Sequence, residues 1–247
     1  MQSRIALVTG GTGGIGTAIV KRLADMGHKV ATNYRNEEKA HAWQEQMKAA
    51  GYDVTLVKGD VTSPEQAEAM VREVEAKLGP IDILVNNAGI TRDGTFHKMK
   101  AEQWTDVINT NLNSVFNVTR PVIEGMRERK WGRVIQISSI NGLKGQYGQA
   151  NYAAAKAGMH GFTISLAREN ARNGVTVNTI SPGYIATDNT QALQEDAARE
   201  AALMARVPAG RWGKPEEIAA PVAFLCSDLA RFIHGAIIPA DGGWLAR

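Results

Sequence analysis

The sequence predicts an α/β fold in which helices cover both faces of one doubly wound parallel sheet. Three observations lead to this prediction. Short β-branched runs alternate with longer amphipathic segments, the predicted strands are apolar on both flanks, and a glycine-rich turn joins the first strand to the first helix. Of the 247 residues, 44% are hydrophobic and 21% are charged, a balance typical of globular proteins. We therefore expect a single domain over residues 1–247.

Hydrophobic periodicity places the individual elements along the chain. Strands are expected at residues 5–9, 29–34, 54–57, 81–85, 134–137, 175–180 and 237–238. Helices are expected near residues 14–26, 37–50, 63–78, 101–129, 151–173 and 190–207. Because strands and helices alternate, right-handed crossovers should join parallel strands.

Local sequence signals support the helix at residues 63–78 and set the segment 190–207 apart from the rest of the chain. In the helix that starts at Ser63, the serine can cap, Pro64 suits the first helical position and Gln66 would complete a capping box. The polar, alanine-rich segment 190–207 interrupts the strand rhythm. We expect it to be part of a mobile substrate lid near residues 188–212.

Composition excludes several classes of function. The only cysteine, Cys226, lies in an apolar run, so no internal disulfide can form and a buried side chain is expected. The five histidines are scattered without metal-ligand spacing, and we expect no metal. A net charge of +3 with dispersed basic residues argues against nucleic-acid binding. With neither a membrane-length apolar run nor a signal-peptide pattern, the sequence predicts a cytoplasmic protein with no membrane partner.

The turn after the first strand is rich in glycine, with the sequence Thr-Gly-Gly-Thr-Gly-Gly-Ile-Gly over residues 9–16. Two spacings overlap, because Gly11, Gly13 and Gly16 fit one phosphate-binding pattern and Gly10, Gly14 and Gly16 fit another. A strand–glycine turn–helix unit lets a pyrophosphate approach backbone amides at the helix N-terminus. The predicted dinucleotide contacts in this turn are Gly10, Gly11, Thr12, Gly14, Ile15 and Gly16.

The end of the second strand bears on the choice of cofactor. An NAD site usually has an acid there for the ribose hydroxyls, but this chain has Asn33, Tyr34 and Arg35. Arg35 could pair with a 2′-phosphate, whereas Glu37 and Glu38 suit the first turn of the next helix. The sequence therefore favours NADP(H) slightly over NAD(H). Asn33 and Tyr34 could instead hydrogen-bond the ribose hydroxyls.

Tyr152 and Lys156 lie four residues apart, and hence on one face of a predicted helix. A tyrosine is a poor acid or base near neutral pH unless a nearby positive charge lowers its pKa. Lys156 could supply that charge.

Together these motifs resemble the short-chain dehydrogenase/reductase family. The resemblance covers nearly the whole chain and rests on Gly10, Gly14, Gly16, the Asn-Asn-Ala-Gly run 86–89, Ser139, Tyr152 and Lys156. It implies a Rossmann sheet of seven parallel strands in the order 3-2-1-4-5-6-7, and a homotetramer formed through the two long helices. It also places further residues along the cofactor: Asp60, Val61, Asn87, Ala88, Gly89, Pro182, Gly183, Ile185 and Thr187.

The same resemblance implies a catalytic tetrad of Asn111, Ser139, Tyr152 and Lys156. Tyr152 would donate a proton to the carbonyl oxygen of a ketone while the nicotinamide delivers hydride to its carbon. Ser139 would hydrogen-bond the same oxygen, and Asn111 would hold a proton-relaying water. Lys156 would lower the pKa of Tyr152 and bind the nicotinamide ribose. Ser138 should point the other way and be structural.

Local stretches suggest the substrate. Residues 90–99 resemble bacterial 3-oxoacyl thioester reductases, and residues 111–119 and 138–149 resemble acetoacetyl-CoA reductases of polyhydroxybutyrate synthesis. The predicted product is (R)-3-hydroxybutyryl-CoA. The predicted substrate contacts are Asp93, Lys98, Ser139, Gln146, Tyr147, Gln149, Tyr152 and Tyr184, with Lys98 or Arg92 as a candidate contact for coenzyme A phosphate. The alternatives are a 3-oxoacyl-(acyl-carrier-protein) reductase of fatty-acid synthesis and, more remotely, an inactive dinucleotide-sensing protein.

Overall fold

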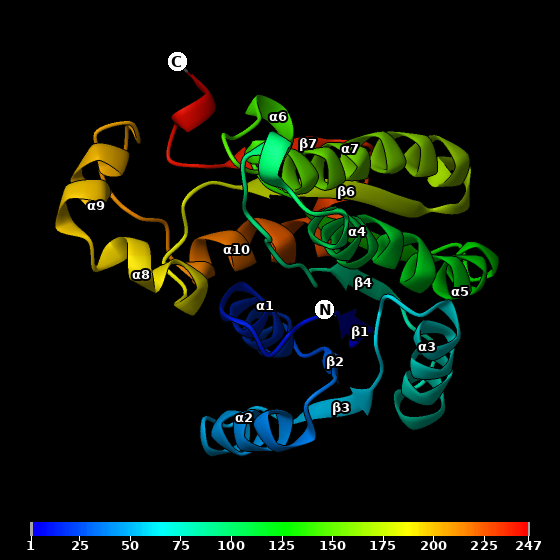
Figure 1. Ribbon diagram of the computed structural model, residues 1–247. Helices are drawn as coiled ribbons and strands as arrows, with labels where there is room; N and C mark the ends of the chain where they lie inside the picture. Colours follow the sequence, from blue (N-terminus) through cyan, green and yellow to red (C-terminus); the bar gives the residue numbers. More distant parts are fainter. Residues whose placement is uncertain (1, 247) are drawn as a thin grey trace.

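A computed structural model describes residues 2–246 and contains one parallel sheet of seven strands (Figure 1). The strand order is β3-β2-β1-β4-β5-β6-β7, as predicted. The strands are β1 Ile5–Val8, β2 Lys29–Tyr34, β3 Val54–Lys58, β4 Ile83–Asn86, β5 Gly132–Ile137, β6 Val175–Pro182 and β7 Ile237–Ala240. The order reverses between β1 and β4, which places a crevice at the carboxyl ends of these strands.

Helices cover both faces of the sheet (Figure 1). The α-helices along the chain are α1 Gly14–Asp25, α2 Glu37–Ala49, α3 Pro64–Leu78, α4 Ala101–Ile108, α5 Ser114–Glu128, α6 Asn141–Lys144, α7 Ala150–Asn170, α8 Gln191–Gln194, α9 Ala197–Met204 and α10 Pro215–Cys226, of which α8 and α9 lie away from the sheet. Helices α1 and α10 pack together on one face, and α3, α5 and α7 contribute to the core on the other.

Alternate residues of the strands supply the two cores. On β1, Ala6 and Val8 belong to the core under α1 and α10, whereas Leu7 belongs to the core under α3 and α5. On β4, Ile83 and Leu84 divide in the same way. This two-sided burial explains why the strands read as continuous apolar runs.

Two predicted helices are interrupted. Residues 101–129 form α4 and α5 separated by a π-helical turn, Asn109–Asn113, and such turns are frequent at functional sites. Residues 190–207 form only the short helices α8 and α9. Hydrophobic periodicity could not predict the interruption of either helix, because the helical spacing of polar residues continues through both segments.

The capping box predicted at Ser63 is half wrong. The Ser63 hydroxyl accepts from the Gln66 backbone N–H at 3.2 Å, as expected for a cap. The Gln66 side chain, however, accepts from the Asp60 N–H at 3.1 Å, because the Ser63 N–H already donates to the Asp60 carbonyl at 3.1 Å. The side chain therefore ties the end of β3 to α3.

Cys226 is buried at the end of α10, as the sequence predicts. Burial raises the pKa of its thiol to about 12. In the described part of the chain, no helix combines the length and apolar character needed to cross a membrane.

Candidate active site

The glycine turn between β1 and α1 is shaped by backbone conformation and close packing. Gly10 has a φ of +62°, and a Cβ there would lie 3.0 Å from the Ala88 Cα atom. A Cβ at Gly11 would lie 2.5 Å from the Thr32 hydroxyl oxygen, whereas one at Gly13 would have no atom nearer than 3.6 Å. The geometry therefore requires glycine at Gly10 but not at Gly13, which favours the second of the two spacings.

Side chains from neighbouring strands hold this turn in place. Asn33 accepts from the Gly10 N–H at 2.9 Å and donates to the Gly59 carbonyl at 2.9 Å. Asn87 donates to the carbonyls of Thr9 and Gly10, both at 3.0 Å. Both side chains thus shape the loop, and the suggestion that Asn33 binds ribose hydroxyls stays a prediction.

The N-terminus of α1 is open to an anion. Its N-cap residue, Gly13, gives no side-chain cap, and the first turn of α1, all of it within the described residues, carries no acid. By contrast, Asn36 caps α2 and Ser63 caps α3, and both helices have acids in their first turn, including the predicted Glu37 and Glu38. Free amide donors and the positive helix end suit a dinucleotide pyrophosphate, so the residues present fit the cofactor that the sequence implies.

The segment after β6 closes over the same turn. A Cβ at Gly14 would lie 2.9 Å from Thr187 Cγ2, and Ile185 is buried and bridges to Gly213. Pro182 is buried at the end of β6, and a Cβ at Gly183 would lie 2.7 Å from Asp241 Cα. The predicted contacts Thr12 and Ile15 lie half-buried in the turn below.

At the other end of the crevice, Arg35 is exposed and its guanidinium lies 3.6 Å from Asp60. Burial tends to raise the pKa of Asp60, but hydrogen bonds from Thr62 and the Arg35 charge outweigh it and lower the pKa. Tyr34 packs near His41, and the Val61 carbonyl accepts from Asn117. Sequence reasoning missed the pairing of Arg35 with Asp60, because the two residues come from different strands.

Three of the four predicted catalytic residues meet at the carboxyl end of β5. Ser139 follows β5, and Tyr152 and Lys156 lie one turn apart on α7. The Ser139 hydroxyl faces the Tyr152 phenol and acts to lower its pKa. Lys156 Nζ lies 5.6 Å from the centroid of the Tyr152 ring and donates to the Ile137 carbonyl at 2.6 Å. A Cβ on Gly89 would lie 3.7 Å from this ammonium, so the Asn-Asn-Ala-Gly run borders the site.

The pKa values differ from the prediction. Burial raises the pKa of Tyr152 to about 12, although the Ser139 hydroxyl opposes this shift, and the Asp93 charge adds to it. Burial lowers the pKa of Lys156 to about 8. The predicted lowering of the tyrosine pKa by Lys156 is therefore wrong, since desolvation of the phenol outweighs the other influences.

Asn111 is fully buried in the π-helical turn between α4 and α5. Its side chain accepts from the Ile90 N–H at 2.7 Å and donates to the Ile90 carbonyl at 2.8 Å. The amide thus fixes the segment after β4, and its predicted role in holding a water remains a prediction.

Ser138 was expected to point to the opposite side from Ser139 and to have a structural role, and its contacts agree with this expectation. Its hydroxyl donates to the Lys156 carbonyl at 2.9 Å and lies 2.9 Å from His160 Nε2. Burial, followed by the Lys156 charge, lowers the pKa of His160. Sequence reasoning missed His160, although its position four residues after Lys156 places it on the same face of α7.

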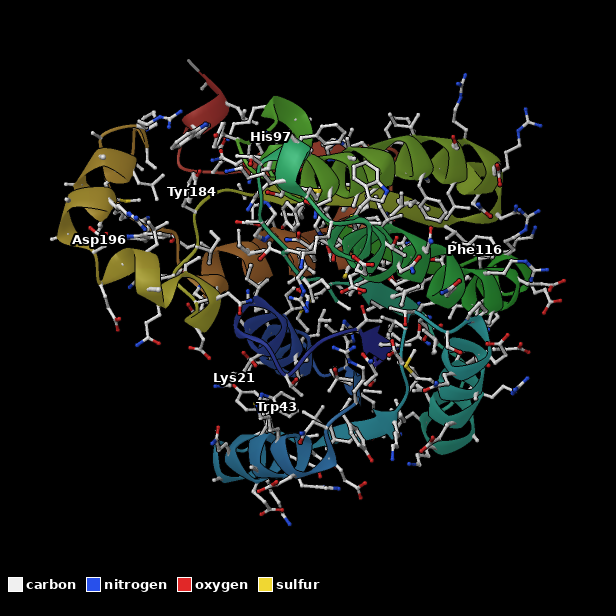
Figure 2. The ribbon with its side chains drawn as sticks, in the orientation of Figure 1. Lys21, Trp43, His97, Phe116, Tyr184 and Asp196 are labelled. Atoms are coloured by element: carbon white, nitrogen blue, oxygen red, sulfur yellow. The ribbon has the colours of Figure 1, made fainter. Side chains whose placement is uncertain are left out.

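Two hollows lie near this site, and the lining of neither includes Asn111, Ser139, Tyr152 or Lys156. One of about 250 Å³ is lined by Gly94, Thr95, Phe96, His97, Gln146, Tyr147, Gly148 and Ala150. The other, of about 210 Å³, is lined by residues that include Tyr184, Ile185 and Val207. Figure 2 shows Tyr184 between the sheet and α9, and His97 beside α6.

The predicted substrate contacts differ in how free they are. Tyr147 is 87% exposed, and Lys98 is exposed in the neighbouring loop. The Gln149 amide is occupied, because it donates to Asp93 at 3.0 Å and accepts from Asn141 at 2.8 Å. Gln149 and Asp93 therefore brace the loops around the first hollow, and a contact between the Gln149 amide and a thioester stays a prediction.

Comparisons with known proteins agree with this architecture. A family model described as enoyl-(acyl carrier protein) reductase matches residues 10–245. The acetoacetyl-CoA reductase of Allochromatium vinosum is 54% identical over 98% of this chain and 98% of its own length. The 3-oxoacyl-(acyl-carrier-protein) reductase of Escherichia coli is 48% identical over 98% of this chain and 97% of its own.

A solved structure, that of gox2181, has a TM-score of 0.95 and 37% sequence identity, covering 100% of this chain and 97% of that one. The matched residues include the glycine turn, the β5 end and the Tyr152–Lys156 helix, so the likeness extends to the whole crevice. The chain belongs to the short-chain dehydrogenase/reductase family.

Proposed function

We propose that this protein reduces the ketone of acetoacetyl-CoA to (R)-3-hydroxybutyryl-CoA, for polyhydroxyalkanoate synthesis in the cytoplasm. The observation that carries the proposal is the grouping of Ser139, Tyr152 and Lys156 at the carboxyl end of β5, next to a helix N-terminus open to a dinucleotide. Relatives named acetoacetyl-CoA reductase, at 50–54% identity over nearly the full chain, support the choice of substrate.

The bound nicotinamide supplies a hydride to the ketone carbon, and this chain's residues manage the charge on the oxygen. A pKa of about 12 keeps Tyr152 protonated at neutral pH, so its hydroxyl is available to donate the proton that the oxygen needs. Ser139, beside Tyr152, orients the same oxygen. Once the phenol has lost its proton, the Lys156 ammonium stabilises the phenolate.

For the cofactor we propose NADPH in preference to NADH. The support is the exposed Arg35 guanidinium at the end of β2, where a 2′-phosphate could replace Asp60 as its partner. Arg35→Ala is expected to lower kcat/KM with NADPH about ten-fold and to leave NADH turnover nearly unchanged. Equal use of both cofactors before and after the substitution would contradict this preference.

We also propose that the chain acts as a homotetramer of single-domain subunits, with residues 188–212 as a lid. The exposed large apolar side chains include Trp104 and Phe116 on α4 and α5, and Phe224, Leu229 and Phe232 on α10 and in the segment that follows it. Figure 2 shows Phe116 on the outer side of α5. Phe116→Glu should lower the mass measured by light scattering, whereas a monomeric wild-type protein would contradict the proposal.

The deciding experiment follows nicotinamide absorbance with acetoacetyl-CoA and with acetoacetyl-acyl carrier protein, each with NADPH and NADH. Higher kcat/KM for the coenzyme A ester supports the proposed function. Preference for the carrier protein would instead indicate fatty-acid synthesis, an alternative supported by relatives with that name. Turnover of neither ester would refute the substrate class.

A further inference from the structure

Two cationic side chains pack on the indole ring of Trp244. Lys144 Nζ lies 5.3 Å from the ring centroid, and Arg206 Cζ lies 4.6 Å from it. Lys144 ends α6, Arg206 follows α9, and Trp244 lies in the C-terminal turn, which is drawn between those helices in Figure 1. Three segments that are distant in sequence thus bring two positive charges to one aromatic ring.

These cations lack the acidic partners that others in the lid region have. Arg199 pairs with Asp196 at 3.2 Å and Arg211 with Glu217 at 2.7 Å. Within residues 2–246, neither Lys144 nor Arg206 forms an ion pair with a carboxylate. Lys144 donates only to neutral oxygens, those of Gly145 and the Gln146 side chain. Two like charges held together without an acid would be stabilised by a bound anion.

The cation pair borders both hollows of the candidate site. Gln146, the partner of Lys144, lines the first hollow together with Tyr147. Trp244 packs on Tyr184 with the ring centroids 5.0 Å apart, and Tyr184 lines the second hollow. An anionic group bound by the pair would therefore lie at the rim of the substrate site, away from Tyr152.

We propose that Lys144 and Arg206 form a subsite for phosphate groups of the pantetheine-linked substrate. This inference rests on the proposed function, in which the substrate is a thioester whose carrier bears phosphate groups beyond the pantetheine arm. The planar Arg206 guanidinium suits bidentate phosphate binding, and Lys144 adds a point charge. Packing on Trp244 holds both side chains before binding, which reduces the entropy lost when the phosphate binds. Binding energy from this remote group would help to position the ketone.

Kinetics with a truncated substrate isolate the phosphate contribution. Acetoacetyl-N-acetylcysteamine carries the same ketone and thioester but no phosphate. We expect the double variant Lys144→Gln/Arg206→Gln to lower the ratio of kcat/KM for acetoacetyl-CoA to that for the truncated ester about ten-fold. The charge-conserving Lys144→Arg/Arg206→Lys variant should largely restore the ratio. Arg199→Gln, which removes a paired lid cation, is the matched control and should not change it.

Lys98→Gln tests the position that the sequence suggested for the same phosphates. An unchanged ratio in the Lys144/Arg206 double variant would overturn the proposal, and so would a ratio that falls only in Lys98→Gln. Equal losses with both esters would also overturn it, because the pair would then serve only to pack the lid against Trp244.

Calorimetry separates failure of this subsite from failure of the proposed function. With NADP⁺ saturating the nicotinamide site, wild-type protein should bind coenzyme A about ten-fold more tightly than pantetheine, and the double variant should lose that preference. This measurement needs no turnover. If neither ester is reduced, the proposed function fails, while calorimetry still decides the subsite: equal binding of the two compounds by wild-type protein would overturn it.

Discussion

The glycine turn and residues 188–212, for which we propose a lid function, are built differently. Around the glycine turn, α1 buries Ala18, Ile19, Val20 and Leu23, and strand side chains hold the loop backbone. In this segment no residue of α8 or α9 is fully buried, and Leu203 and Met204 pack against the small cluster around Trp244. A preformed backbone cradle suits a group that is always the same, here the cofactor pyrophosphate, whereas a weakly packed segment can adapt to a substrate.

The largest effect should come from separating chemistry from cofactor binding. Tyr152→Phe is expected to lower kcat by about 10²–10⁴-fold, because the proton donor is lost, while the glycine turn still binds the dinucleotide. Stopped-flow kinetics and cofactor fluorescence titration measure the two properties. Near-normal turnover in this variant would remove the proposed mechanism, and lost cofactor binding would show that the two regions are not independent.

Lys156 should reduce the stability of the ligand-free protein near neutral pH. Burial lowers its pKa from 10.5 to about 8, so the unfolded chain holds the proton more tightly than the folded one between these values. Folding therefore carries a penalty below pH 8 that disappears as pH rises toward 10.5. Lys156→Met should be more stable than wild type by about 1–3 kcal/mol at pH 7 yet inactive. A stability difference in urea unfolding that does not shrink between pH 7 and pH 10 would contradict this cause.

The glycine positions test the preformed cradle directly. Gly10→Ala forces a side chain into a positive-φ conformation and against Ala88, and should cost about 1–3 kcal/mol of stability and weaken cofactor binding. Gly13→Ala is the matched control, since its Cβ would meet nothing nearer than 3.6 Å. Thermal unfolding and cofactor titration provide the readouts, and equal effects from both substitutions would contradict the distinction between the two spacings.

The smallest effects concern helix caps in the two regions. Ser63→Ala removes the α3 cap and should lower the free energy of global unfolding by about 1 kcal/mol. Asp196→Ala removes the α9 cap, whose carboxylate accepts from the Arg199 N–H at 3.1 Å. Because no residue of α9 is fully buried, this loss should speed proteolysis in the proposed lid without changing the free energy of global unfolding. An equal fall in global stability would show that the lid unfolds together with the sheet.

Much of the candidate site was predictable because its signals are local. The Tyr152–Lys156 spacing follows from helix periodicity, and the glycine turn follows from a strand that must turn sharply into a helix. The Arg35–Asp60 pair, the Ser138–His160 contact and the π-helical turn at Asn111 were not predictable. The first two join residues distant in sequence, and the third depends on how α4 and α5 pack against their neighbours.

By itself the sequence determined the parallel sheet, the positions of its strands and the candidate catalytic residues. It could do so because strand periodicity, helix periodicity and glycine conformation act over a few residues. Only the tertiary structure decided which of those side chains already hydrogen-bond within the protein. Asn33 and Gln149 are occupied by the loops they brace, and Trp244 gathers Lys144 and Arg206 from two other segments. Burial likewise set the pKa values of Tyr152 and Lys156, because desolvation depends on what packs around a group rather than on its neighbours in sequence.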